Sequence, residues 1–135
     1  MLKKLGVVLT LPVFVGLLAA ADDKKPEPKY EMRFYVFGML KRGPKWTAED
    51  TPETRKIQEG HMANIQKMAA MGKLIVAGPM AGDGELRGIF IFDAKSIDEV
   101  KAMAEMDPAI QSGRLTLELH KWYAAAGMRV NEPKP

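Results

Sequence analysis

The order of strand-like and helix-like hydrophobic patterns along residues 30–128 is the sequence feature that constrains the fold most. Four segments are rich in branched and aromatic residues, which predicts strands: residues 32–40, 73–77, 86–92 and 114–123. Two segments, residues 52–71 and 96–107, repeat apolar positions every three or four residues, which predicts helices. The order strand, helix, strand, strand, helix, strand predicts an α+β fold of the ferredoxin-like βαββαβ type.

The last predicted strand indicates how the sheet is covered. Its leucines alternate with polar and aromatic residues: Leu115, Leu117 and Leu119 on one face, and Thr116, Glu118, His120 and Trp122 on the other. Right-handed crossovers place the first and third strands side by side at the centre. Both of these strands are apolar on both sides, so we expect a second copy to cover the open face, giving a homodimeric α+β barrel.

The first residues are typical of a signal peptide. Lys3 and Lys4 precede an uncharged, mostly apolar run over residues 5–18, and Ala19 and Ala21 fit a small-residue cleavage site. The run is short for a membrane span, which needs about 20 apolar residues. We therefore expect cleavage after Ala21 and a periplasmic or secreted protein, with an uncleaved anchor as the alternative.

The remaining chain divides into a charged, proline-containing linker at residues 22–29, one domain at residues 30–128 and a tail at residues 129–135. Loss of residues 1–21 leaves 18 basic and 17 acidic residues, a balance that does not favour nucleic acid or a membrane as a partner. The absence of cysteine excludes disulfides, zinc–thiolate sites and cysteine nucleophiles.

Several short motifs together resemble those of the YciI-like (YCII-related) family over about residues 30–123. These motifs are His61, the run Ala77-Gly78-Pro79, the pair Asp107-Pro108 leading to Arg114, and the stretch from Glu118 to Trp122. The resemblance implies a dimeric ferredoxin-like barrel and a small enzyme with a His–Asp pair at its active site, although the activity of the family is mostly unassigned. The signal peptide and the long loop at residues 41–51 depart from the family pattern.

His61 is the central candidate for chemistry. It lies on the inward stripe of its predicted helix, four residues after Ile57 and four before Ile65. A neutral imidazole there can act as a general base near neutral pH. The alternative is a core histidine whose ring is merely hydrogen-bonded.

Asp107 is the expected partner of His61. It continues the inward stripe of the second helix, and both helices start at the same end of the sheet. At about 1.5 Å per residue, His61 and Asp107 differ in height by only ~3 Å. The carboxylate would fix the tautomer of the imidazole and stabilise the imidazolium. The alternative is that Asp107 only caps a turn before Pro108.

Four further residues are expected at the substrate site: Gly78, Pro79, Pro108 and His120. For the cluster that contains His120, the alternative is packing at an interface, with Glu118 paired to a cross-strand base such as Arg87 or Arg33. The histidines do not have the spacing of metal ligands, so no metal site is expected.

Three functions remain open on the sequence. The first is a small enzyme of isomerase or lyase type, in which His61 and Asp107 move a proton on a small-molecule substrate without a cofactor. The second is a non-catalytic ligand-binding module, with haem as one possible ligand. The third is a structural dimer without a ligand.

Overall fold

The computed structural model describes residues 29–129, and within them the predicted order of elements is confirmed. The elements are β1 (Met32–Arg42), α1 (Pro52–Ala70), β2 (Leu74–Pro79), β3 (Leu86–Phe92), α2 (Ile97–Ala104), α3 (Pro108–Gln111) and β4 (Leu115–Ala125). The predicted signal peptide, residues 22–28 of the linker and residues 130–135 of the tail lie outside the described residues. Within the described range, no helix is long and apolar enough to span a membrane.

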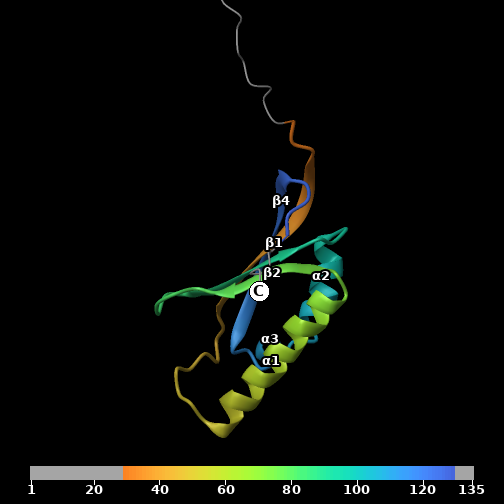
Figure 1. The fold of residues 1–135 in the computed structure, drawn as a ribbon. Coiled ribbons are helices and arrows are strands. Elements are labelled where there is room, and N and C mark those ends of the chain that lie inside the picture. Colours follow the sequence, from red (N-terminus) through yellow and green to blue (C-terminus); the bar gives the residue numbers. More distant parts are fainter. Residues whose placement is uncertain (1–28, 130–135) are drawn as a thin grey trace, which may run out of the picture.

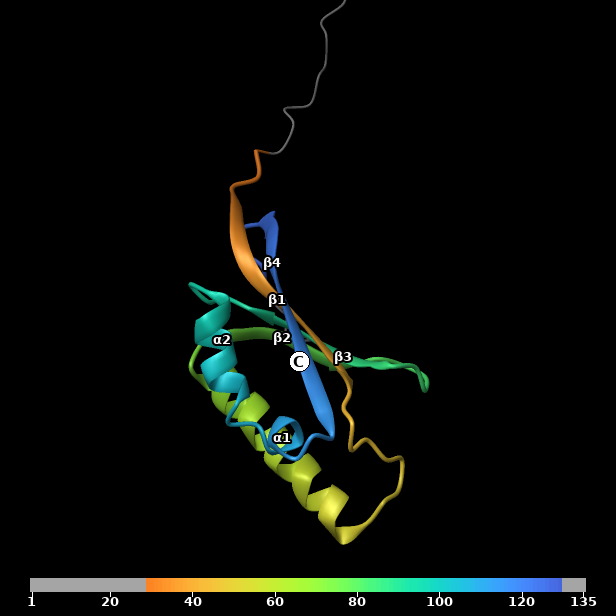
Figure 2. The same cartoon turned by 180° about the vertical axis from the view of Figure 1, so that it is seen from behind.

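The four strands form one antiparallel sheet in the order β2-β3-β1-β4. The predicted central position of β1 and β3 is therefore confirmed. Figures 1 and 2 show α1 and α2 on the same face of the sheet. The loop from β1 to α1 lies at the end of the sheet where β4 begins, as Figure 2 shows.

The main core lies between this face of the sheet and the helices. Its buried residues come from strands and helices alike: Val36, Leu40, Met68, Leu74, Phe90, Phe92, Val100, Ala109 and Leu115. The rings of Phe90 and Phe92 pack edge to face with centroids 5.6 Å apart. Each large apolar side chain buried in this way contributes about 1.5–3 kcal/mol, so this layer fixes where α1 and α3 rest on the sheet.

Both ends of α1 follow the local sequence. Thr51 is the N-cap, and its hydroxyl accepts a hydrogen bond from the Thr54 N–H (3.1 Å), while Thr54 Oγ1 accepts from the Thr51 N–H (2.9 Å). Pro52 occupies the first turn, where its missing N–H costs nothing. Gly72 adopts φ 69° just after the helix, a conformation that favours glycine and ends the helix as predicted.

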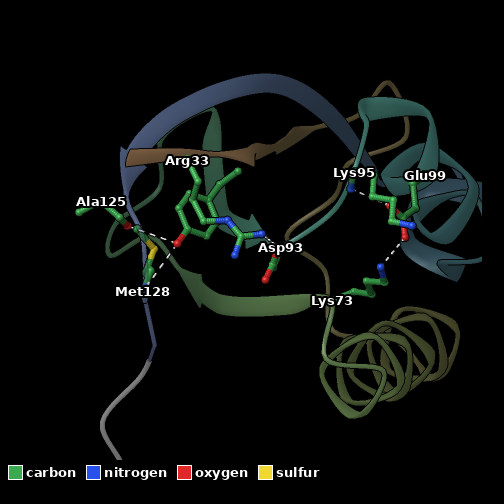
Figure 3. A network of polar contacts seen from close by, with 8 residues as sticks. Arg33, Lys73, Asp93, Lys95, Glu99, Ala125 and Met128 are labelled. Carbon is green, nitrogen blue, oxygen red and sulfur yellow. Dashed lines mark hydrogen bonds and ion pairs between the residues drawn. The ribbon is translucent and has the colours of Figure 1, made fainter. Parts of the chain in front are cut away.

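At the start of α2 only half of a capping box is formed. Ser96 is the N-cap and accepts from the Glu99 N–H (3.1 Å), but the Glu99 carboxylate accepts from the Lys95 N–H (2.8 Å) instead of the Ser96 N–H. The other carboxylate oxygen pairs with Lys73 (2.6 Å), as Figure 3 shows. The hydrogen bond from Lys73 is the main reason why the pKa of Glu99 is lowered. This contact ties the start of β2 to the start of α2.

The second helix is shorter than the predicted residues 96–107, and a separate short helix follows it. It ends at Ala104, and α3 begins at Pro108 with Asp107 as its N-cap in an extended conformation (φ −77°, ψ 121°). The residue before a proline is disfavoured in helical conformation, which separates the two helices at Asp107.

The opposite face of the sheet carries a smaller cluster formed by Tyr35, Ile91 and Ala124. The chain that follows β4 covers part of it. Tyr35 Oη donates to the Ala125 carbonyl (3.2 Å) and accepts from the Met128 N–H (3.4 Å). Figure 3 shows Ala125 and Met128 next to each other, and the Arg33–Asp93 ion pair (2.6 Å) to their right.

Candidate functional site

His61 of α1 and Asp107 at the start of α3 meet beneath the sheet. His61 Nδ1 lies 2.7 Å from Asp107 Oδ2, and the two residues are 6% and 0% exposed. The glycine before His61 allows this approach, because a Cβ on Gly60 would lie 2.7 Å from Pro108 Cγ. The juxtaposition predicted from the helix spacing is therefore present.

Asp107 makes two contacts with its two carboxylate oxygens. Oδ2 faces His61, and Oδ1 accepts a hydrogen bond from the Ala109 N–H (2.8 Å), which caps α3. Both interpretations of Asp107, imidazole partner and helix cap, thus hold together. An ionised carboxylate only accepts hydrogen bonds, so neutral His61 must carry its proton on Nδ1, which leaves the Nε2 lone pair available as a base.

A cavity of about 330 Å³ lies beside His61. Its walls are mostly apolar: Leu40, Trp46, Gln58, His61, Met62, Ile65, Ala77, Gly78, Pro79, Arg87, Gly88, Phe90 and Leu115. The ring of Phe90 stacks on the imidazole with centroids 6.2 Å apart and an interplanar angle of 24°. The volume is at the lower end of the range for ligand pockets, about 300–1,000 Å³, and is suited to a small molecule.

Of the four expected substrate-binding residues, two line the cavity and two do not. Gly78 and Pro79 line the cavity with His61, whereas Pro108 and His120 do not. Pro108 lies against Gly60 and sets the distance between α1 and α3. His120 is exposed on β4 and pairs with Glu118 (2.7 Å).

Glu118 does pair with a cross-strand base, as the alternative expected, but the base is Lys41 of β1 and neither Arg87 nor Arg33. Glu118 bonds both Lys41 and His120, and the hydrogen bond from Lys41 is the main reason why its pKa is lowered. In the sheet register Glu118 lies opposite Met39, while Arg33 lies opposite Ala124 near the other end of the strand. Lys41 is therefore the nearest cation on the same face.

Comparison with known proteins identifies the family. The YCII-related domain matches residues 34–122, which is most of the chain. The chain belongs to the YCII-related family. A solved structure of 5-chloro-2-hydroxyhydroquinone dehydrochlorinase from Burkholderia phenoliruptrix, in complex with 2,5-dihydroxybenzoquinone, is similar at 22% identity with a TM-score of 0.49; the similarity covers 64% of this chain and 92% of that chain. No curated protein sequence matches.

The sequence did not point to the cavity residues of this YCII-related domain that come from the long first loop and from β3. Trp46 lies in the loop and Arg87 in β3, and both line the cavity. The loop is held against the start of β4, because the Gly43 N–H donates to the Arg114 carbonyl and the Lys45 N–H to the Gly113 carbonyl (both 2.9 Å). The sequence signal that could have pointed to this part of the cavity is a tryptophan in a loop that contains proline and glycine.

No cluster that could hold a metal ion is present among the residues that the structure describes in the YCII-related domain. In this arrangement the Nε2 lone pair of His61 is available as a base, the contact with Asp107 orients the ring, and the walls around it are mostly apolar.

The contact between Gly60 and Pro108 leads to a prediction about stability. Alanine in a helix is normally favoured over glycine by about 1 kcal/mol, but an added methyl here would overlap Pro108. Overpacking of this kind costs about 1–3 kcal/mol. We expect Gly60→Ala to lower the melting temperature and to move Asp107 away from His61, as judged by thermal unfolding and imidazole ¹⁵N chemical shifts.

The matched control for this variant is Gly84→Ala. A Cβ on Gly84 meets nothing within 4 Å, and Gly84 does not have a positive φ. Its melting temperature should stay near that of the wild type. A Gly60→Ala protein that is more stable than the wild type would show that α3 can move away from α1 without a loss of stability.

Proposed function

We propose that this protein is a small-molecule enzyme in which His61 transfers a proton on a substrate bound in the adjoining cavity. The observation that carries the proposal is the 2.7 Å contact between His61 Nδ1 and Asp107 Oδ2 at the wall of a mostly apolar cavity. A structural histidine needs a hydrogen-bond partner but no cavity beside it. Here the partner fixes one ring nitrogen, and the same ring also lines the cavity.

The proposed chemistry follows from this arrangement. Nε2 of neutral His61 takes a proton from an acidic carbon or hydroxyl of the substrate, and the Asp107 carboxylate stabilises the imidazolium that forms. Return of the proton to another atom gives isomerisation, and loss of a leaving group gives elimination. A positioned general base contributes about 10²–10⁴-fold to such a rate, and the step needs no cofactor.

The volume of the cavity favours this function over the haem-binding alternative. About 330 Å³ accommodates a molecule of roughly one ring, with Gly78 and Pro79 forming part of the wall.

The experiment that tests this function is proton exchange in D₂O. A panel of small carbonyl acids and hydroxy acids is incubated with the protein, and ¹H NMR follows replacement of carbon-bound protons by deuterium. We expect exchange of at least one compound above the buffer rate, dependent on His61. If no member of a broad panel exchanges, proton-transfer chemistry is contradicted.

We further propose that the protein acts as a homodimer joined through the face of the sheet opposite to the helices. Trp122 on this face is 38% exposed and packs against Phe37, with ring centroids 6.2 Å apart. Residues 124–128 cover only the region near Tyr35. A second copy would bury the remaining aromatic surface.

Light scattering tests the dimer. We expect the domain at micromolar concentration to have about twice the monomer mass, and Trp122→Glu to shift it toward monomer because a charge would be buried in the interface. Met106→Glu, which adds the same charge at an exposed position after α2, should leave the mass unchanged. A wild-type monomer would rule out assembly through this face.

Export with cleavage after Ala21 is also proposed, on the basis of the apolar run and the small residues that precede Asp22. The full chain, produced in a bacterial host, should yield a mature protein that begins at Asp22. Intact-mass spectrometry of the purified protein measures this directly. A mass that retains residues 1–21 would instead support an uncleaved anchor.

A further inference from the structure

Three arginines surround the tryptophan that lines the cavity. The guanidinium carbons of Arg42, Arg87 and Arg114 lie 5.4, 5.1 and 4.6 Å from the centroid of the Trp46 ring. Arg42 ends β1, Arg87 lies in β3, and Arg114 directly precedes β4. Segments far apart in the sequence therefore bring three permanent positive charges around one indole.

Within the part of the chain that the structure describes, these charges have no anionic partners. Over residues 29–129, none of the three arginines forms a salt bridge. Their hydrogen bonds go to backbone carbonyls: Arg42 to Asp83 (2.6 Å), Arg87 to Gly82 (2.8 Å) and Gly84 (3.3 Å), and Arg114 to Thr47 (2.7 Å). The Nε atoms of Arg42 and Arg87 are buried without an acceptor, which is unusual for such strong donors.

Arg33 of the same chain is an arginine that does have an anionic partner. Its guanidinium also lies over an aromatic ring, 5.4 Å from the centroid of Tyr35, but it is paired with Asp93 at 2.6 Å. Stacking on an aromatic ring is therefore not what distinguishes the Trp46 cluster. The difference is the missing carboxylate, and it occurs where Arg87 and Trp46 form the wall of the cavity that contains His61.

We propose that the cavity binds a small organic carboxylate, whose charge is held by Arg87 at the cavity wall and whose carbon skeleton packs on Trp46 and Phe90. Arg42 and Arg114, on the same indole, add to the positive charge near this wall. This inference rests on the proposed function, because it names the substrate class of the same cavity. Arg87 lines the cavity without a carboxylate partner among residues 29–129, and guanidinium binds carboxylate in paired geometry. The positive charges would also stabilise negative charge that develops when His61 removes a proton.

The experiment compares benzoate with benzamide, which has nearly the same shape but no charge. Binding is followed by isothermal titration calorimetry of the mature protein at low and high salt. We expect benzoate to bind at least about tenfold more tightly than benzamide at low salt, since hydrogen bonds between charged groups are stronger than those to a neutral amide. Benzoate affinity should fall as salt rises.

Three variants assign the effect to the cluster. Arg87→Gln should remove most of the preference for benzoate over benzamide, whereas Arg87→Lys, which keeps the charge, should retain part of the preference. Arg33→Gln is the matched control on a paired, exposed arginine, and it should bind both compounds like the wild type. Circular dichroism checks that each variant is folded.

The outcomes separate this inference from the proposed function. Equal binding of benzoate and benzamide by the wild type, or no binding of either, overturns the carboxylate site whether or not Arg87→Gln folds. An unchanged preference in folded Arg87→Gln also overturns it. A preference for benzoate in a protein that exchanges no proton supports the carboxylate site and contradicts only the base chemistry.

Discussion

Replacement of Asp107 by asparagine is expected to reduce proton exchange by about 10²–10⁴-fold, because it reverses the tautomer of the general base. The backbone N–H of Ala109 requires an oxygen from residue 107, since it now bonds Oδ1 at 2.8 Å. The amide NH₂ of asparagine must then face His61 Nδ1. Nδ1 can accept only if the ring proton moves to Nε2, and the lone pair that would take the substrate proton is lost.

The same variant should remain folded. It keeps the cap of α3 and a hydrogen bond to His61, so we expect to lose only about 1–2 kcal/mol of stability, the difference between a charged and a neutral bond. Imidazole ¹⁵N chemical shifts, which distinguish the two tautomers, provide a measurement that a purely structural role would not alter. If folded Asp107→Asn keeps both the wild-type tautomer and its exchange rate, Asp107 does not position the base.

The fold could be predicted from the sequence because each element carries its own local signal. The caps Thr51 and Ser96 and the stop at Gly72 act within a few residues, and all three are present in the structure. The separation of α2 from α3 at Asp107 was harder to predict from the sequence. The prediction of a meeting with His61 assumed one helix that continued from Ser96, whereas Asp107 occupies an extended position between α2 and α3. The contact is made because Gly60 lets α3 approach α1.

The cavity wall could not be predicted to the same extent, because it depends on register and on loop conformation. A shift in the pairing of β1 with β3 between Leu40 and Lys41 sets the relation between these strands next to Arg87. The loop that carries Trp46 has no hydrophobic period. The sequence pattern therefore indicated His61 and Asp107, whereas the cluster of arginines around the indole could be recognised only in the assembled sheet.

Replacement of His61 by glutamine is expected to lower proton exchange by at least about 10²-fold, since an amide has no basic lone pair to take a proton. Glutamine is preferable to leucine here, because Asp107 is 0% exposed and its carboxylate would lose its side-chain donor. An unpaired buried charge costs about 3–5 kcal/mol, so His61→Leu would be destabilised under either interpretation of the histidine. The glutamine side chain can donate to Asp107 Oδ2 and keep the carboxylate paired.

His120→Gln provides the matched comparison, because the chain has only two histidines and both lie beside a carboxylate. The pair of His120 and Glu118 is exposed on β4 and does not line the cavity. We expect His120→Gln to exchange protons at the wild-type rate, and ¹H NMR in D₂O measures both variants on the same substrate. Equal losses of proton exchange in the two variants would indicate that His120 belongs to the substrate site, as the sequence alone suggested. Full activity in folded His61→Gln would leave His61 as a core histidine that is merely hydrogen-bonded to Asp107.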